Sequence, residues 1–481
     1  MVETGEVMVR GGLSEQELAT LNDNNAPKLV VTPPGPKAAL IRAKQQLYET
    51  HTVKYMKYFP TAWESGKGAT LKDVDGNVFI DWSAGAGVIN VGYSNPMISK
   101  AIKDQADKII HTLDVPSEGR VDFLEGLNSI LPPKMRDNSK VIFSITGSDA
   151  NEAAAKISRY IRNKSTIITF EGAYHGMHAA ALAMSSVAPL QRGIAPYMAG
   201  VTRAPYAYCY RCPWGKNYGD CAYECLRYVE HLFEDPYSGL YEPSAIQVEP
   251  IQGEGGYIVP PDEFIQGLRK IADKYSVDLI FDEVQAGFGR TGRMWASEWA
   301  GVTPDIMAIS KSIAAGVPLA AIVYRKDYDE KLPDAFHLGT YRGNALATAT
   351  GVEVLHFLTS SGVVERARKL GPEILNSFKD MMAESKIIGD VRGRGFMIGI
   401  EFVRNKDTKE PGPELASKVQ AECFKRGLVV LKMGHYGNCI RFVPPLTITK
   451  ELIDKSLNIF RDSVKATEAN PPSPETEHAM G

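Results

Sequence analysis

The chain has 481 residues, of which 44% are hydrophobic and 23% are charged, as is ordinary for a globular protein with more than one core. Lys plus Arg number 54 and Asp plus Glu number 57, so the formal net charge of -3 lacks the basic excess of a nucleic-acid-binding protein. No uncharged apolar run reaches the roughly 18 residues of a transmembrane helix, and six cysteines are too few for a disulfide scaffold. We therefore expect a cytoplasmic enzyme with neither nucleic acid nor membrane as a partner.

The two ends of the chain carry little apolar pattern. Residues 1–36 are polar and end in Pro33-Pro34-Gly35-Pro36, which predicts a flexible N-terminal arm. Residues 467–481 hold three prolines and three glutamates without apolar periodicity, which predicts a disordered tail.

Between the ends, short apolar runs alternate with helical patterns. Because these runs are apolar on both faces and bounded by Gly, Pro or Asp, they predict a mostly parallel sheet with crossover helices. After about residue 345, a long helix over 345–358 leads into a second α/β unit with apolar runs at 396–402 and 440–442. The predicted strands of the first unit are 141–145, 167–170, 245–248, 279–281, 306–309 and 319–323.

Five of these strands are followed by residues that carry chemistry. In open α/β sheets, ligands bind beyond the carboxyl ends of the strands, so we expect these residues to share one site. In chain order, they are Gly147 and Ser148, then Tyr174 and His175, then Glu249, Asp282 and Lys311.

Each feature has a plainer alternative, but the set favours one cofactor. Ser148 opens a helix and suits a phosphate cup or a simple N-cap. Asp282 follows buried residues and needs a cation beside it, while Lys311 is either exposed or a buried nucleophile. A phosphate cup, a carboxylate and a lysine together indicate pyridoxal phosphate. Neither Gly-x-Gly-x-x-Gly nor a P-loop occurs, which disfavours nicotinamide and ATP.

The run 280–292, Ile-Phe-Asp-Glu-Val-Gln-Ala-Gly-Phe-Gly-Arg-Thr-Gly, resembles the core motif of the class III aminotransferases, which are pyridoxal phosphate enzymes of fold type I. The resemblance spans about residues 37–463 and is strongest to the 4-aminobutyrate aminotransferase group. Further matching segments are 173–176, 248–256, 304–312, 339–344 and 388–393.

This resemblance implies the fold type I architecture, with a large pyridoxal-phosphate-binding domain over 75–345 built on a mostly parallel central sheet. A smaller α/β domain would combine the N-terminal segment 37–74 with the C-terminal domain 346–466. The family also implies a homodimer or a dimer of dimers, with the cofactor at the junction of the domains and at the dimer interface.

The resemblance assigns cofactor roles residue by residue. Lys311 would form the Schiff base and move protons, and Asp282 would pair with the pyridine nitrogen. Tyr174 would stack on the ring with His175 beside it, and Gln285 would contact the ring hydroxyl.

Phosphate and substrate roles follow in the same way. Gly147 and Ser148 would bind the phosphate, and Thr340 would reach the phosphate of the neighbouring subunit. Arg441 would hold a substrate carboxylate bidentately, and Glu249 would pair with Arg441 when no carboxylate is bound.

One position departs from the family. Enzymes that use 4-aminobutyrate usually carry Arg after Tyr-His-Gly, but this chain carries Met177, which cannot pair with a carboxylate. This argues against 4-aminobutyrate and against the usual 2-oxoglutarate site, unless Arg192 or Arg342 substitutes. We predict an aminotransferase that moves an amino group from an amine or amino acid with a short or apolar distal part to a 2-oxo acid. The alternative is a class III amino-acid racemase or epimerase, because these also lack that Arg.

Four cysteines cluster outside these motifs, at Cys209, Cys212, Cys221 and Cys225. Their spacing is short for a structural zinc site, and free thiols that pack a surface loop are the alternative. We therefore assign no metal to the predicted active site.

Overall fold

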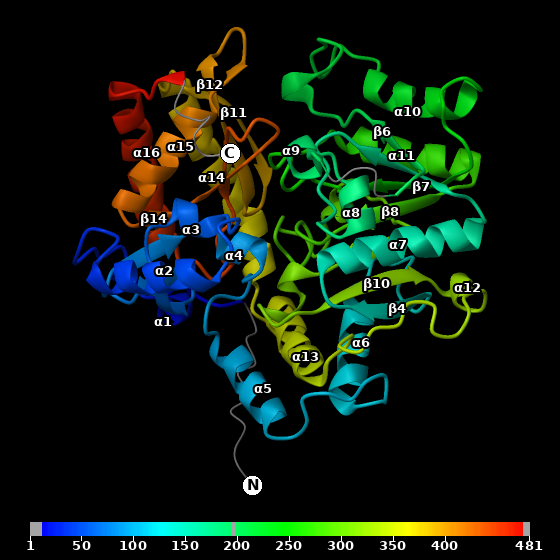
Figure 1. Cartoon of the computed structure of the whole chain (residues 1–481), viewed down its shortest axis with the longest axis horizontal. Coiled ribbons are helices and arrows are strands. Elements are labelled where there is room, and N and C mark those ends of the chain that lie inside the picture. Colours follow the sequence, from blue (N-terminus) through cyan, green and yellow to red (C-terminus); the bar gives the residue numbers. More distant parts are fainter. Residues whose placement is uncertain (1–11, 194–197, 475–481) are drawn as a thin grey trace.

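The chain forms two halves, one of which is built from both ends of the sequence. The computed structural model describes residues 12–193 and 198–474. In Figure 1 the N-terminal elements in blue lie beside the C-terminal elements in orange and red, and the cyan and green elements form the other half. We call the half that contains β4 to β10 the large domain and the half that contains β1 to β3 and β11 to β16 the small domain.

The large domain is built on a seven-stranded sheet with the order β4-β10-β9-β8-β7-β5-β6. β10 is antiparallel to both neighbours and the other pairs are parallel, so the predicted mostly parallel sheet is confirmed. The sequence analysis missed the short edge strand β6. The strands are β4 (Ser139–Ser144), β5 (Thr166–Phe170), β6 (Val201–Ala204), β7 (Pro243–Val248), β8 (Asp278–Asp282), β9 (Ile306–Ile309) and β10 (Ala320–Arg325).

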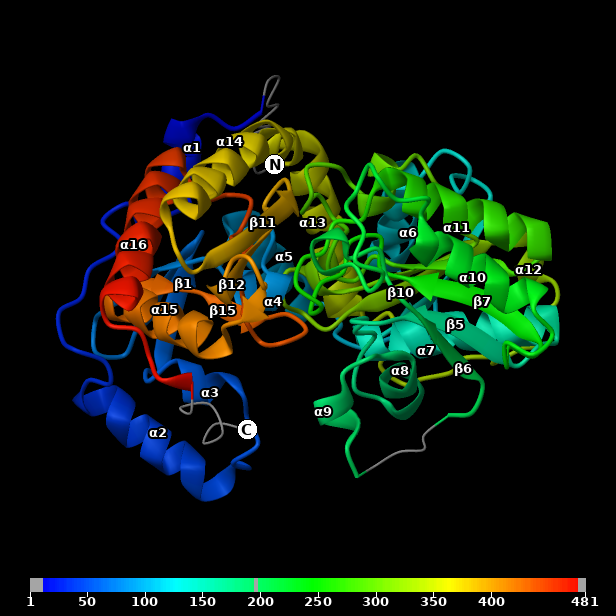
Figure 2. The same ribbon diagram turned by 90° about the horizontal axis from the view of Figure 1, so that it is seen from above.

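Helices cover both faces of this sheet, which explains why its strands are apolar on both sides. Ile280 packs in one cluster with α7 (Gly147–Arg162), while its neighbour Leu279 packs with α10 (Glu224–Glu234) and α11 (Asp262–Tyr275). Figure 2 shows α7 on one side of β5 and β7, with α10 and α11 on the other. Other helices of this half are α5 (Pro96–Ala106), α6 (Glu118–Ile130), α8 (Ala179–Met184), α9 (Ala188–Gln191), α12 (Lys326–Asp329) and α13 (Ala345–Ser360). The short helix α4 (Ala84–Gly87) lies with the N-terminal elements of the other half, where Ala86 packs with Phe59 and Phe424.

The small domain joins the two ends of the chain through backbone pairing. The short strand β14 runs parallel to β3 and completes the sheet β1-β2-β3-β14. The predicted boundary between residues 74 and 75 is wrong, because it falls inside the β2–β3 hairpin, which lies wholly in this sheet. The strands are β1 (Trp63–Lys67), β2 (Thr70–Asp73), β3 (Val78–Asp81) and β14 (Leu428–Val429).

A second, antiparallel sheet faces the large domain and has the order β11-β12-β16-β15, with β13 paired to β12. Its strands are β11 (Ile388–Arg394), β12 (Met397–Asn405), β13 (Glu410–Pro411), β15 (Leu431–Met433) and β16 (Cys439–Phe442). The helices of the small domain are α1 (Glu15–Thr20), α2 (Pro36–Tyr48), α3 (Tyr55–Tyr58), α14 (Val363–Glu384), α15 (Pro413–Lys425) and α16 (Lys450–Ala469).

The N-terminal arm packs against the small domain from residue 12 onward. A capping box of Ser14 and Glu17 starts α1, and Leu18 is fully buried. The Asn22 side chain donates to the carbonyl of Thr447, 425 residues away. The predicted flexible arm is therefore wrong for residues 12–36, because these contacts fix it, while residues 1–11 lie outside the described part.

The C-terminal tail begins later than predicted. α16 continues to Ala469, and Thr467 is fully buried with its hydroxyl donating to the Ser463 carbonyl. The predicted start of disorder at residue 467 is therefore wrong, and residues 475–481 lie outside the described part. Over the described ranges, none of the helices has the length and apolar character needed to cross a membrane.

We predict that Leu18→Ala lowers the free energy of unfolding by about 2–5 kcal/mol, because it leaves a cavity where α1 meets the core. Urea unfolding of the purified enzyme measures this change. The matched control is Leu47→Ala at a side chain that is 75% exposed, which should change the value by less than about 0.5 kcal/mol. Equal effects of the two substitutions would show that the arm is not packed.

Candidate active site

Five strand ends of the large sheet converge on one cavity of about 140 Å³. The strands β4, β5, β7, β8 and β9 supply the loops that line it, as the sequence predicted for a parallel sheet. Eight predicted site residues line the cavity, namely Gly147, Ser148, Tyr174, His175, Glu249, Asp282, Gln285 and Lys311, together with Asn151, Gly176, Glu254 and Val284.

Asp282, the last residue of β8, is buried and held by three donors. Its Oδ2 accepts from Asn151 Nδ2 at 2.8 Å and lies 2.8 Å from His175 Nδ1. Its Oδ1 accepts from the Val284 backbone at 3.0 Å. These contacts fix the carboxylate at the cavity wall, where it can pair with a cationic ring nitrogen.

The sequence analysis gave Asn151 no role in this site. Its amide also donates to the His175 carbonyl and accepts from Gln247 Nε2, both at 3.0 Å. Asn151 lies one helical turn after Gly147, on the buried face of α7, whose other residues are Ala and Ile apart from Ser158. A polar residue on the buried face of a helix is the sequence signal that could have identified Asn151 as a site residue.

The predicted phosphate cup lies at the N-terminus of α7, a helix of 16 residues. Thr146 caps the helix, leaving the amides of Gly147 and Ser148 at its positive end. Gly176 crosses this end with φ of 129°, and a Cβ there would lie 2.0 Å from Ser148 Oγ. Ser148 Oγ also accepts from the Met177 backbone at 3.0 Å, so the two loops form one cradle.

Lys311 stands two residues after the end of β9, in a backbone conformation with φ of 47°. Such left-handed geometry is uncommon for a side-chain-bearing residue and is frequent at functional sites. The hydroxyls of Ser310 and Ser312 bind the carbonyls of Leu319 and Gly87 on either side of it. Burial lowers the pKa of Lys311, with Glu254 and Asp282 partly opposing it, which shifts the side chain toward the neutral, nucleophilic amine relative to an exposed lysine.

The predicted pairing of Glu249 with Arg441 is wrong. Both Glu249 oxygens are taken by backbone amides, from Tyr174 at 3.0 Å and Gly253 at 2.8 Å. Burial, with the charge of Asp282, raises the pKa of Glu249 to about 7.

Arg441 pairs instead with Glu254, whose Oε1 lies 2.8 Å from Nη1. Both glutamates stand in one motif, so the sequence could not decide between them. Although burial favours the protonated form of Glu254, the charges of Arg441 and Lys311 hold its pKa below the usual range.

Met177 and Thr340 are exposed and do not line the cavity of a single chain. Neither Arg192 nor Arg342 lines the cavity in place of the family arginine that Met177 replaces. Arg342 lies 2.8 Å from Asp149, and Arg192 is exposed at the end of α9. The structure thus brings together most of the predicted site but leaves Met177 and Thr340 outside it. Arg441 is buried and does not line the cavity itself, but it contacts the lining residue Glu254.

The residues present fit pyridoxal phosphate. Gln285 Oε1 and His175 Nε2 are buried without a hydrogen-bond partner in the described structure, so the cavity offers unused polar atoms to a ligand. Asp282 suits the ring nitrogen, Gln285 the ring hydroxyl, the start of α7 the phosphate, and Lys311 the aldehyde.

The four clustered cysteines line a different hollow, between β6 and α10. All are unpaired, and burial raises the pKa of Cys209 to about 11 and of Cys225 to about 12, with the neighbouring thiols adding to it. Of the residues placed in the structure, no three His, Cys, Asp or Glu side chains are arranged to hold a metal ion.

Known proteins resemble this chain over most of its length. The family model described as Aminotransferase class-III matches residues 52–464. An alanine/serine racemase of Pyrococcus horikoshii is 37% identical over 449 residues, covering 92% of this chain and 93% of that protein. A diaminobutyrate–2-oxoglutarate aminotransferase of Haemophilus influenzae is 36% identical over 432 residues, covering 88% and 94%.

A solved structure agrees with both the fold and the cofactor. The ornithine aminotransferase of Toxoplasma gondii superposes with a TM-score of 0.77 at 26% identity, covering 89% of this chain and 94% of its own. Its active site is partially occupied by PLP.

We predict that Gly176→Ala weakens pyridoxal phosphate binding by at least about tenfold, because the added methyl group would displace Ser148 from the phosphate cradle. Fluorescence titration of the apoenzyme with the cofactor measures this affinity. Gly193→Ala is the control, since Gly193 also has a positive φ, of 79°, but faces open space. Unchanged affinity in Gly176→Ala would contradict the cradle.

Proposed function

This chain belongs to the class III aminotransferases, which work with pyridoxal 5′-phosphate, and we propose that it moves an amino group from an amine or amino acid to a 2-oxo acid with Lys311 as the cofactor-bound lysine. The observation that carries the proposal is the single cavity that contains Lys311, Asp282 and the start of α7. These three features match the aldehyde, ring nitrogen and phosphate of one molecule.

The bound cofactor supplies an electron sink that makes the substrate's α-proton removable. Asp282 keeps the ring nitrogen protonated, and His175 and Asn151 keep Asp282 in place. The Tyr174 ring lies in the same cavity and is assigned to cover the cofactor ring.

Lys311 is the acid–base group of the reaction. Because burial lowers its pKa, its Nζ would accept the α-proton when cofactor and substrate are bound. The same Nζ would return the proton at the cofactor's aldehyde carbon. Water would then release the donor's 2-oxo acid, and the reverse reaction with a second 2-oxo acid would complete the transfer of the amino group.

Arg441 and Glu254 form the substrate gate. A guanidinium binds a carboxylate bidentately, so an amino acid or 2-oxo acid replaces Glu254 on Arg441. Among the described residues, Lys311 is the one lysine or arginine in the cavity lining, which supports donors whose distal part is short or apolar.

An exposed apolar surface around Thr340 supports a homodimer or a dimer of dimers. The His111 and Tyr341 rings have centroids 5.8 Å apart, so the segments that carry them lie side by side. Contiguous exposed apolar surface of this kind usually marks an interface. Thr340 would there reach the cofactor phosphate of the second copy. The exposed side chains are Ile109, Ile110, Leu113, Val115, Leu338 and Tyr341.

The compartment is inferred from cysteine chemistry. All six cysteines are unpaired, as expected in a reducing environment. This supports the cytoplasmic location that the composition predicts.

We predict that Leu338→Asp dissociates the dimer, because it buries a charge without a partner in the interface. Light scattering after gel filtration should show a mass near the 52.7 kDa of one chain. The control is Tyr237→Asp, at a side chain that is 95% exposed, which should leave the mass of the assembly unchanged. If the Leu338→Asp variant keeps the mass of the assembly, this surface is not the dimer interface.

The experiment for the main proposal supplies the holoenzyme with one L-amino acid and one 2-oxo acid, either pyruvate or 2-oxoglutarate. We expect the amino acid of the acceptor and the 2-oxo acid of the donor to form in equal amounts, measured by mass spectrometry. Lys311→Ala should lose the visible absorbance of the lysine-bound cofactor and reduce the rate by about 10,000-fold. Asp282→Asn should retain the cofactor but lose most activity, because a neutral ring is a poor electron sink.

Amino-acid racemase is the second candidate, and the alanine/serine racemase relative favours it. A racemase needs a second proton donor. Glu254 is ill suited because Arg441 and Lys311 keep it ionised, and both oxygens of Glu249 are engaged by backbone amides. The same assay without a 2-oxo acid decides between them. Loss of optical rotation there, with no amino-group transfer when an acceptor is added, would overturn the aminotransferase proposal.

A further inference from the structure

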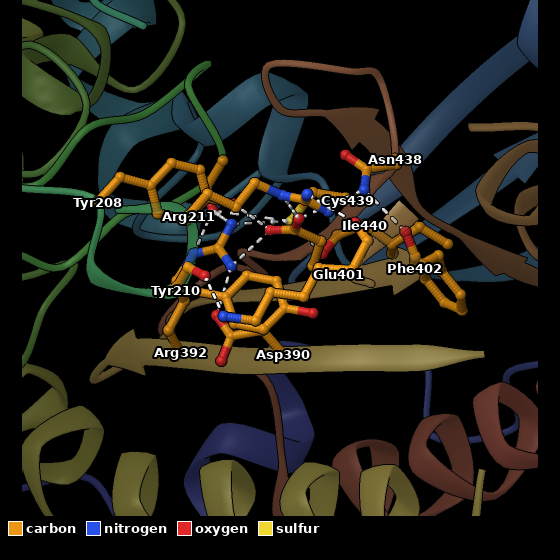
Figure 3. Close-up of polar contacts among 12 residues, drawn as sticks. Tyr208, Tyr210, Arg211, Asp390, Arg392, Glu401, Phe402, Asn438, Cys439 and Ile440 are labelled. Carbon is orange, nitrogen blue, oxygen red and sulfur yellow. Dashed lines mark hydrogen bonds and ion pairs between the residues drawn. The ribbon is translucent and has the colours of Figure 1, made fainter. Parts of the chain in front are cut away.

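Glu401 lies almost fully buried where a segment of the large domain meets the small-domain sheet (Figure 3). We call residues 206–211, between β6 and α10, the strap. Its Arg211 Nε donates to Glu401 Oε1 at 2.6 Å, and its Tyr208 hydroxyl donates to Oε2. From the small domain, Arg392 Nη1 donates to Oε2 at 2.7 Å. One carboxylate therefore joins both domains.

The cluster is held in its charged form. Burial raises the pKa of Glu401, but Arg392, the Tyr208 hydroxyl and Arg211 outweigh it, so the pKa lies below its usual range. Arg211 also donates to the Lys409 carbonyl at 2.7 Å, which fixes the strap to the small domain at a second point. Arg392 Nη1 also donates to Asp390 Oδ2 at 2.6 Å, so Glu401 and Asp390 together hold its guanidinium. Removing one partner would leave the buried cluster with unbalanced charge.

Arg392 extends this cluster to the loop of the substrate gate. Its Nε and Nη2 both donate to the Gly256 carbonyl, at 3.0 and 2.7 Å. Gly256 stands two residues after Glu254 with φ of 127°, and a Cβ there would lie 2.8 Å from Nη2. The Glu254 carbonyl itself accepts from the Gly434 amide at 2.9 Å. The small domain therefore binds the backbone of this loop at both Glu254 and Gly256.

The other half of the gate comes from the same sheet. β12 pairs with β16 so that Glu401 lies opposite Cys439, and Gly399 lies opposite Arg441. Arg392 thus touches the Glu254 loop, while Arg441 stands on the strand next to β12. The distance between the backbones of Glu254 and Arg441 therefore depends on the cluster of Glu401, Arg392 and Arg211.

We propose that Arg392, held by Glu401 and backed by Arg211, is a positioning residue that fixes the Glu254 loop against the strand of Arg441 and so sets the affinity for a substrate carboxylate. The inference rests on the proposed role of Arg441. When a carboxylate binds, the Glu254 side chain leaves Arg441 while Arg392 keeps the loop backbone in place. Without that restraint the loop shifts and the space for the carboxylate is lost.

The test measures binding of pentanoate to the holoenzyme by calorimetry. Pentanoate carries a carboxylate but no amino group, so it reports the gate whichever reaction the enzyme performs. Arg392→Lys should weaken binding by about tenfold, because one ammonium cannot replace the forked contacts of the guanidinium. Arg211→Met should weaken it by a smaller factor, since Arg211 touches Glu401 and not the loop. The visible absorbance of the cofactor should stay unchanged in both.

Arg404→Lys is the matched control. Arg404 stands on β12, the strand paired with the β11 strand of Arg392, and its guanidinium donates to both Glu414 oxygens at 2.7 Å. Among the described residues, its hydrogen bonds and ion pairs do not include the Glu254 loop. It should lose stability without losing pentanoate affinity, which separates positioning from general destabilisation.

Arg441→Met distinguishes failure of the inference from failure of the proposed function. It should abolish pentanoate binding, and wild-type affinity there would refute the carboxylate role of Arg441 and the inference with it. If Arg441→Met abolishes binding but Arg392→Lys binds as the wild type does, the positioning role alone is refuted. If Arg392→Lys yields no folded holoenzyme, an Arg211→Met variant that binds pentanoate as tightly as the wild type refutes the positioning role instead.

Discussion

Taking a charge out of water is costly unless a partner meets it, and this structure buries several charges whose partners come from distant segments. Asp282 at the end of β8 meets His175 from the loop after β5 and Asn151 from helix α7. Arg441 meets Glu254 across the domain junction. Because each charge needs its partner, these pairs fix how the segments lie, and the shape of the cavity follows from them.

The two domains divide the work of the site. The large sheet contributes the groups that suit the cofactor, since the carboxyl ends of its parallel strands meet at one edge. The small domain contributes Arg441, which suits the substrate. The loop that carries Glu249 and Glu254 belongs to the large domain, but Arg392 of the small domain binds its backbone. Selection of the substrate therefore depends on how the domains are joined.

The aminotransferase and racemase chemistries share their first proton removal, so the cofactor site is expected to look alike in both. What differs is where a proton can be returned. In this cavity Lys311 is the amine whose pKa burial lowers, and Glu254 is kept ionised by its cationic neighbours. Glu249, whose pKa burial raises to about 7, also titrates near neutral pH, but both its oxygens accept from the Tyr174 and Gly253 amides. The arrangement therefore favours Lys311 as the proton carrier and with it amino-group transfer.

The sequence by itself determined the central sheet, the family and the cofactor side of the site. Strands buried on both faces are continuous apolar runs, which a sequence shows directly. Asp282 ends one such strand, and Lys311 stands two residues after another.

Only the tertiary structure decided which glutamate faces Arg441, because Glu249 and Glu254 stand five positions apart in one motif and the choice depends on a strand nearly 190 residues later. It also decided that the arm packs and that β14 completes the N-terminal sheet. Such contacts join residues hundreds of positions apart, and local patterns of polarity carry no information about which distant surface a segment will meet.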